Sequence, residues 1–417
     1  MTSFSLSSWR RPEILLMVMA GAMPIAFWSW SVLLNNFTIE FANFTGREIG
    51  ILQSLREVPG FLSFLVVYLL LVIAEQRLAL LALGILGAGV AMTGYFPTVI
   101  GLYITTVISS IGFHYYEACN QSLTLQWLDK KTAPETMGKI YGVGAFTQLL
   151  TLSVILCVYM AGVGSFSWEA LAGTDGLVND ISSYQLFYVG AGIVTILMAL
   201  FAYMAFPHFG EKVFQRRQII LRKRYWLYYA LTFIAGARRQ IFLVFASFLM
   251  VEKFGYSLAQ ITALFLLNAA FNMWLAPLVG KIIGRVGERV ALVVEYIGLI
   301  IVFIAYAFVE SGTVAAGLYV IDHMFFAFAI AIKTYFQKIG APEDMASTAS
   351  VAFTINHIAA VVIPAAFGFI WLINPSAVFF AGAAMAALSL ILSLNVPRNP
   401  EEGHEVVFGH RGERIAA

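Results

Sequence analysis

Two kinds of residue are scarce in this chain, cysteines and charged side chains. Its 417 residues include only Cys119 and Cys157, and both lie in apolar runs, which argues against a disulfide framework or a zinc site. Charged residues make up 12% of the chain, whereas a soluble globular protein carries about 25%. The composition therefore indicates a membrane protein.

Motifs of catalysis are missing as well. The sequence has no nucleophile elbow, no His-Glu-x-x-His pair, no phosphate-binding loop and no hydrophilic stretch that makes a soluble domain of useful size. We therefore expect no enzyme activity, no cofactor, no bound metal and no nucleic-acid partner.

Long apolar runs are abundant instead. Hydrophobic residues make up 60% of the chain and its mean hydropathy is +0.83, and an apolar window of about 20 residues can cross a bilayer as a helix. These windows predict an all-α polytopic membrane protein with twelve spans, near 13–35, 47–73, 77–95, 98–127, 138–163, 184–206, 225–250, 258–283, 290–309, 312–336, 347–373 and 376–396. The first window runs past Trp30 without a small-residue cleavage site, which favours a retained helix over a signal peptide.

The basic residues of the loops predict the orientation. With the N-terminus inside, the inner loops hold sixteen Lys and Arg residues, and the outer loops hold only Arg47 and Lys253. Because cytoplasmic loops are enriched in Lys and Arg, both termini are expected in the cytoplasm. We expect a monomer embedded in the lipid bilayer of a bacterial inner (plasma) membrane.

A repeat divides the chain in two. The motif "APETM" begins at Ala133 and "APEDM" at Ala341, an offset of half the chain, and the two occupy equivalent inner loops. A match at this offset favours a duplicated six-helix bundle. The predicted organisation is a first bundle at 1–206, a basic linker at 207–224, a second bundle at 225–396 and a disordered polar tail at 397–417.

The inner loop "GKIIGRVGER" carries a resemblance to a known family. Its residues Gly280, Arg285, Gly287 and Arg289 match the signature loop of the major facilitator superfamily (MFS), while Gly284 stands where that family often has an aspartate. The resemblance implies the MFS fold, with twelve transmembrane helices in two pseudo-symmetric bundles, and alternating access. The fifth predicted helix lacks the Gly-Pro-x-x-Gly-Gly element of many drug/proton antiporters, which counts against a multidrug exporter.

Polar and charged side chains lie deep in several predicted spans, where they are costly and commonly functional. At a rise of 1.5 Å per residue, several of them fall about 14–20 Å from the inner face, a single layer near the membrane midplane. The residues of this set that we interpret are Arg56, Glu57, His114, Glu117, Asn120, Gln121, Arg238, Arg239, Gln240, Glu295, Asp322, His323, Lys333, Asn356 and His357.

Arginine cannot lose its proton and is suited to grip a carboxylate or phosphate, so the arginines are assigned to an anionic or zwitterionic solute. The predicted solute-binding residues are Arg238, Arg239, Arg56, Trp28, Trp30, Gln121, Asn268, Asn272 and Asn356. The acids and histidines can titrate, which suits proton coupling. The predicted proton-coupling residues are Glu117, Asp322, Glu57, His114, His323 and His357.

Structural roles compete with each assignment. Arg56 and Glu57 are about 100° apart on a helix, so each is expected to pair across helices. Arg238 and Arg239 cannot point the same way, so one is expected to face the solute and the other an acid. Glu295 is expected to hold Arg285 or Arg289 of the signature loop.

Three functions remain open. The leading one is a proton-coupled secondary transporter for a small organic solute that is anionic or zwitterionic. The second is a proton antiporter that exports cationic or amphiphilic compounds, with the acids and aromatics as ligands. The third is a non-transporting membrane scaffold or sensor, which the number of costly midplane charges disfavours.

Overall fold

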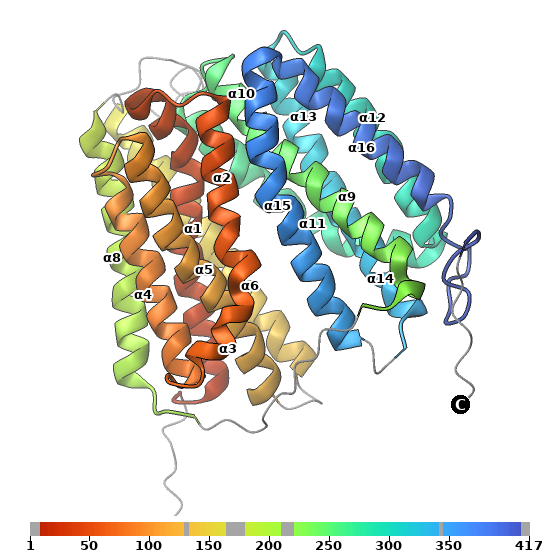
Figure 1. The fold of residues 1–417 in the computed structure, drawn as a ribbon. Helices are drawn as coiled ribbons and strands as arrows, with labels where there is room; N and C mark the ends of the chain where they lie inside the picture. Colours follow the sequence, from red (N-terminus) through yellow and green to blue (C-terminus); the bar gives the residue numbers. More distant parts are fainter. Residues whose placement is uncertain (1–8, 129–132, 164–179, 210–220, 342–344, 410–417) are drawn as a thin grey trace, which may run out of the picture. The chain divides into compact units, whose positions relative to one another are not determined.

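A computed structural model of the chain describes residues 9–128, 133–163, 180–209, 221–341 and 345–409 (Figure 1). The regular structure of these residues is helical, apart from one isolated bridge between Glu401 and His404. This agrees with the all-α prediction, because a helix satisfies its own backbone hydrogen bonds where no water is present. Two compact units make up the fold.

The first unit comprises Met1–Phe44, Leu55–Gln215 and Tyr256–Ala269. Its helices are α1 (Pro12–Ala42), the second part of α2 (Gly46–Phe61), the 3-10 turn η1 (Leu62–Leu65), α3 (Val66–Leu69), α4 (Glu75–Thr93), α5 (Val99–Trp127), α6 (Ala133–Val163), α8 (Ile181–Ala205) and the first part of α11 (Leu258–Val286).

Close helix packing in the first unit depends on small residues. Helix α4 runs alongside both α5 and α8 (Figure 1). A Cβ at Gly89 would lie 2.5 Å from the backbone nitrogen of Ser109 on α5, and one at Gly87 would lie 2.6 Å from the carbonyl oxygen of Gly192 on α8. Such contacts replace the hydrophobic effect as the packing force between helices in lipid.

The second unit comprises Thr45–Ser54, Arg216–Gly255 and Ala270–Ala417. It holds the first part of α2 and the second part of α11. Its other elements are the 3-10 turn η2 (Lys223–Tyr225), α9 (Trp226–Ile241), the π-helical turn η3 (Phe242–Ala246), α10 (Ser247–Glu252), α12 (Glu288–Ala307), α13 (Gly312–Phe325), the 3-10 turn η4 (Phe326–Phe328), α14 (Ala329–Ile339), α15 (Met345–Ile373) and α16 (Pro375–Ser393).

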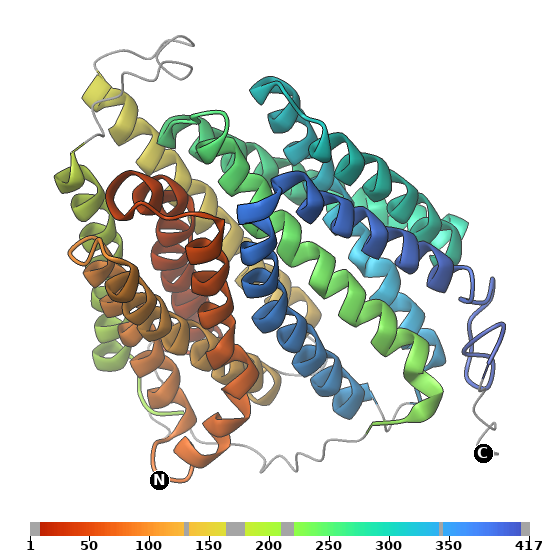
Figure 2. The same ribbon diagram turned by 45° about the horizontal axis from the view of Figure 1, so that its top comes forward.

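In the second unit, α9 lies beside both α15 and α16 (Figure 2). Glycines again permit close approach: a Cβ at Gly298 of α12 would lie 2.2 Å from the ring of Phe325, and one at Gly382 of α16 would lie 2.6 Å from Phe303. Aromatic rings fill the space that remains, with Phe242 stacked on Tyr319 at 5.2 Å.

The helical segments coincide with all twelve predicted spans, although some ends differ. Helix α1 continues to Ala42, beyond the predicted end at 35, and stops at Asn43, whose φ of 53° is left-handed. Ten helices of the described residues are long and apolar enough to cross a membrane. The helix at 46–69 is not among them because its first part carries four charges and its course is broken; of α11, only Leu258–Phe271 reaches the apolar level, as a shorter helix.

Three helices change their winding within a few residues of a buried charge. A π-helical turn begins three residues after Arg239, a 3-10 turn begins three residues after His323, and another 3-10 turn begins five residues after Glu57. Such interruptions leave backbone groups without regular helical partners and are frequent at functional positions. They draw attention to the same charges that the sequence singled out.

The first part of the C-terminal tail is folded, so the prediction of disorder at 397–417 is wrong for the described residues up to 409. Val406 and Glu405 are fully buried. The hydroxyl of Tyr335 donates to the carbonyl oxygen of Glu405, and Arg224 forms a 3.1 Å ion pair with Glu402. The segment was predicted to be disordered because it is polar, but its few apolar groups are covered and its backbone is bonded in the second unit.

Candidate functional site

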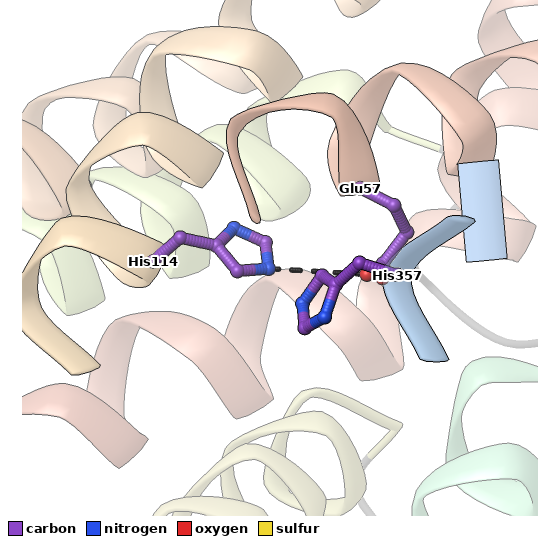
Figure 3. A group of neighbouring side chains, drawn as sticks. All are labelled: Glu57, His114 and His357. Atoms are coloured by element: carbon purple, nitrogen blue, oxygen red, sulfur yellow. Dashed lines mark ion pairs between the residues drawn. The ribbon is translucent and has the colours of Figure 1, made fainter. Parts of the chain in front are cut away.

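The first cluster of buried polar groups lies in the first unit, on α2 and α5. Arg56 Nε donates to Glu57 Oε1 at 3.0 Å, and Arg56 Nη2 bonds the same oxygen. Ser110 Oγ donates to the backbone carbonyl oxygen of Arg56. The imidazole of His114 reaches toward Glu57, with Nε2 3.8 Å from Oε2 (Figure 3). We call these four residues the Arg56 cluster.

The cluster corrects one prediction and agrees with part of another. Arg56 pairs with its neighbour Glu57, although the two positions are about 100° apart, because a long, flexible arginine side chain bridges that offset. Glu57 does also face another helix, through His114.

A pocket lies beside Arg56. Aromatic rings form much of its wall, and the Arg56 guanidinium lies 5.9 Å from the centre of the Trp30 ring. Its space for the centres of water molecules is about 20 Å³, enough for one or two waters. Trp30 Nε1 is buried and has no hydrogen-bond partner among the described residues. The lining residues are Phe27, Trp30, Arg56, Leu86, Val90, Ser109, Ser110 and Phe113.

Other predicted site residues of the first unit lie outside this pocket. Trp28 is half-buried and packs edge to face against Phe265 at 6.3 Å. Glu117 is half-buried, and Gln121, one turn further along α5, is exposed. Asn268 is buried, and neither polar atom of its amide has a hydrogen-bond partner in the described parts of the chain. The side chain of Asn272 lies outside the described residues.

The second cluster lies in the second unit and centres on Arg238 of α9. Its Nη2 donates to Oε1 of Glu295 on α12 at 3.1 Å, and its guanidinium lies 5.0 Å from the centre of the Tyr296 ring. Only 6% of Arg238 and 3% of Glu295 are exposed. Asp322 on α13 is 1% exposed and interacts electrostatically with both residues. We call Arg238, Glu295, Tyr296 and Asp322 the Arg238 cluster.

The prediction for Glu295 was therefore wrong. It was expected to hold Arg285 or Arg289 of the signature loop, and it holds Arg238 instead. The starts of α9 and α12 lie at the same end of the unit, since Tyr225 bonds Ala341 and Glu288 bonds Lys338 close by on α14. A helical side chain leans toward the start of its helix, so Arg238 reaches down from its deeper position to Glu295.

The remaining polar residues of this unit divide into packed and exposed ones. Arg239 is exposed while Arg238 is buried, so the two arginines do point in different directions. His323 is set among aromatic rings, 4.4 Å from Tyr319, and its Nδ1 lies 3.0 Å from the Tyr319 carbonyl oxygen. Half-buried Asn356 lies against α9, where a Cβ at Gly236 would meet its Oδ1 at 2.3 Å. His357 is buried.

The signature loop is a tight joint between α11 and α12. Gly287 alone separates the two helices, and its φ of 83° is a conformation that favours glycine. Arg285 is exposed, Gly280 and Arg289 are half-buried, and Glu288 forms a 2.7 Å ion pair with Lys338 of α14. The loop is thereby tied to the inner end of α14, a contact that the sequence did not reveal.

Residues that sequence reasoning missed share a feature. Glu295 was assigned elsewhere, Ser110 was not considered, and Glu288 was passed over as a loop residue. Charge and depth marked Glu295, but only its neighbours in space identify Arg238 as its partner. Ser110 lies one turn before His114 on α5, so the helical period offered a signal for it.

Chemically, each unit holds an arginine paired with one carboxylate and set against an aromatic ring. A guanidinium can exchange an internal carboxylate for a carboxylate or phosphate of a bound solute, because all three offer similar acceptor oxygens. Carboxylates that are buried can take up a proton at modest acidity. The two clusters therefore have the groups needed to bind an anion and a proton.

Comparison with known families places these features. The family model described as Major Facilitator Superfamily matches residues 14–364. The chain belongs to the Major Facilitator Superfamily. As a member, it is an integral membrane transporter for a small-molecule solute and not an enzyme. A comparison with curated proteins found no match.

Solved MFS structures share the fold at low sequence identity. A mutant of the nucleoside transporter NupG has a TM-score of 0.73 at 13% identity and covers 92% of this chain and 99% of its own. A bacterial homologue of the human lysosomal transporter Spinster, inward-facing and occupied, has a TM-score of 0.72 at 14% identity, covering 93% and 97%. An inward-facing bacterial homologue of the iron transporter ferroportin has a TM-score of 0.70 at 12% identity, covering 93% and 99%. At these identities the likeness concerns the fold alone.

Proposed function

We propose that this MFS chain is a secondary active transporter that moves a small organic solute with an anionic group by alternating access, coupled to protons. The solute is an acid or a zwitterion. The Arg56 pocket is the observation that carries this proposal. A guanidinium that stays charged at every physiological pH stands beside aromatic rings in a membrane protein whose intramembrane charges are costly.

The pocket favours an anion that also has a planar or apolar part. Arg56 supplies donors for a carboxylate or phosphate, and Trp30 adds an unpartnered N–H donor close to the ring face. Phe27 and Phe113 stack at 4.7 Å and extend the apolar wall. The pocket itself has room for small groups only, so the anionic end of a solute fits it better than a bulky scaffold.

Proton coupling is supported by the titratable groups that accompany the arginines. Glu57 and His114 stand in the Arg56 cluster, and Asp322 stands beside Arg238. Glu117, His323 and His357 remain further candidates on the same helices as cluster members or on α15. A proton on one of these groups changes the charge balance of its cluster and can shift the balance between conformations.

The membrane setting follows from the same reasoning as the sequence prediction. We infer that both termini face the cytoplasm of a bacterial inner membrane, because Lys and Arg are concentrated in the linker and the inner loops. The expected unit of transport is the monomer.

A matched ligand screen tests the charge preference. Purified full-length protein is heated with benzoate, benzamide or benzylamine, which share one shape and differ in charge, and with uridine and uridine monophosphate. The proposal expects the anions to raise the unfolding temperature of the wild type, since a ligand that binds only the folded protein stabilises it. The effect should be lost in Arg56→Gln. Stabilisation by benzylamine and not by the anions would favour the export of cationic compounds.

Transport itself needs a second assay. Proteoliposomes that contain a trapped pH dye are given the stabilising anion from the screen, and solute-dependent acidification of the lumen is recorded. Coupled transport predicts a change that protein-free liposomes lack. Flux that is indifferent to an imposed pH gradient in the wild type and in Glu117→Gln and Asp322→Asn would remove proton coupling.

A further inference from the structure

The Arg238 cluster has an imbalance of charge that its ion pair does not resolve. It contains two carboxylates, Glu295 and Asp322, and a single cation, Arg238, all at least nine-tenths buried. A net buried charge is strongly unfavourable in an apolar interior. One proton, shared within the carboxylate pair, makes the cluster neutral.

The hydrogen bonds within the cluster are also incomplete. Arg238 reaches Glu295 through one contact, Nη2 to Oε1, and not through two parallel bonds. Arg238 Nη1, Glu295 Oε2, Asp322 Oδ2 and the Tyr296 hydroxyl have no hydrogen-bond partner among the described residues. Buried polar atoms without partners are uncommon in folded proteins, and they point to a missing water or ligand. The open atoms comprise a donor of the guanidinium and acceptors of both acids.

Neighbouring elements supply no other cation to this cluster among the described residues. Helix α13 adds Tyr319 and His323, whose Nδ1 faces a backbone carbonyl, and α16 carries no titratable side chain. On α14, Lys333 is exposed and Lys338 pairs with Glu288. Helix α15 carries His357. Arg238 is therefore the guanidinium for which Glu295, Asp322 and an incoming anion compete.

We propose that Glu295 is the exchange group of this cluster: one proton on Glu295 releases Arg238, which then binds the anionic group of the solute. The step balances in charge, since the Arg238–Glu295 ion pair, a proton and an anion become a neutral Glu295 and an Arg238–anion pair. This inference rests on the proposed anionic solute, and it assigns to Glu295 a role that the sequence assigned to Asp322. Asp322 then holds the proton that keeps the resting cluster neutral.

The proposal makes a quantitative statement about linkage. If each bound anion requires one proton on Glu295, the apparent affinity for the anion falls about tenfold per pH unit once Glu295 is ionised. Replacing Glu295 by glutamine, which is always neutral, removes this dependence. Aspartate at the same position keeps a titratable carboxylate and restores it.

The test measures benzoate binding to full-length protein in detergent between about pH 5.5 and 8.5, a range in which benzoate itself stays ionised. The wild type and Glu295→Asp should lose affinity about tenfold per pH unit in the upper part of this range. Glu295→Gln should bind with an affinity that changes less than about twofold, and Asp322→Asn should keep the slope. Glu288→Gln, an acid-to-amide change at the start of the same helix, is the matched control and should keep the slope. Circular dichroism and gel filtration verify that each variant is folded.

Several outcomes decide against the exchange. An unchanged slope in Glu295→Gln would overturn it, as would a slope that disappears in Asp322→Asn and persists in Glu295→Gln. Failure of the folded wild type to bind benzoate at the acidic end, when Arg238 is expected to be released, would also overturn it. The broader function fails separately, through stabilisation by benzylamine in place of the anions. Benzoate binding that is independent of pH in the wild type leaves the anion preference intact and removes only the role of Glu295.

Discussion

Arg238 on α9 and Glu295 on α12 form a buried ion pair across 3.1 Å, with the Tyr296 ring beneath the guanidinium. Removing one partner of such a pair leaves an uncompensated buried charge, which costs about 3–5 kcal/mol. We expect Arg238→Ala to destabilise the protein by about this amount. The double variant Arg238→Ala, Glu295→Ala should lose less than the sum of the two single changes, by about 1–3 kcal/mol.

Unfolding of the single and double variants by a graded denaturant in detergent measures this coupling. Arg239→Ala is the matched control, because Arg239 is the adjacent arginine of the same helix and is exposed. Additive losses in the double variant would contradict an energetic pair between Arg238 and Glu295.

Arg56 allows a prediction about geometry as opposed to charge. Arg56→Lys keeps the positive charge but loses the planar fork that donates two parallel hydrogen bonds. We expect the affinity for the anions that stabilise the wild type to fall roughly tenfold, which corresponds to about 1.4 kcal/mol. The unfolding temperature at increasing anion concentration measures this affinity. Equal affinities in Arg56→Lys and the wild type would show that a point charge suffices.

Gly287 and Gly284 give a matched pair in the signature loop. Gly287 has a φ of 83°, a conformation that costs an alanine about 1–2 kcal/mol. Gly284 lies inside α11, and a Cβ there meets no atom within 4 Å. Alanine in an exposed helical position is favoured over glycine by about 0.5–1 kcal/mol. Gly287→Ala should therefore lower the unfolding temperature, and Gly284→Ala should leave it unchanged or raise it.

The folded C-terminal segment can be tested by truncation. Ending the chain after Arg398 removes buried Val406 and Glu405 together with the Arg224–Glu402 ion pair. We expect this truncation to lower the unfolding temperature by several degrees, since it exposes Tyr335 and the inner end of α9 in the second unit. Ending the chain after Gly409 keeps these contacts and should have little effect. The two truncated proteins are compared by thermal unfolding, and equal temperatures would mean that the segment contributes no stability.

Much of the architecture was predictable because the bilayer makes the sequence local in its consequences. A segment such as 288–307 must be helical wherever it packs, since lipid offers its backbone no partner. The signature residues Gly280, Arg285, Gly287 and Arg289 also indicated the family that the comparison confirmed. The broken helix at 46–69 and the π-helical turn after Ile241 had no comparable signal, because they depend on packing between helices.

The sequence by itself determined which residues are expensive: it identified Arg56, Glu57, Arg238 and Asp322 as charges deep in apolar helices, from composition and helical rise alone. Only the tertiary structure decided their partners. Arg56 turned to its own neighbour, Glu295 to Arg238, and Glu405 to the buried end of α14. The physical reason is that burial is a property of a residue's surroundings on several helices, whereas the sequence records distance along one helix.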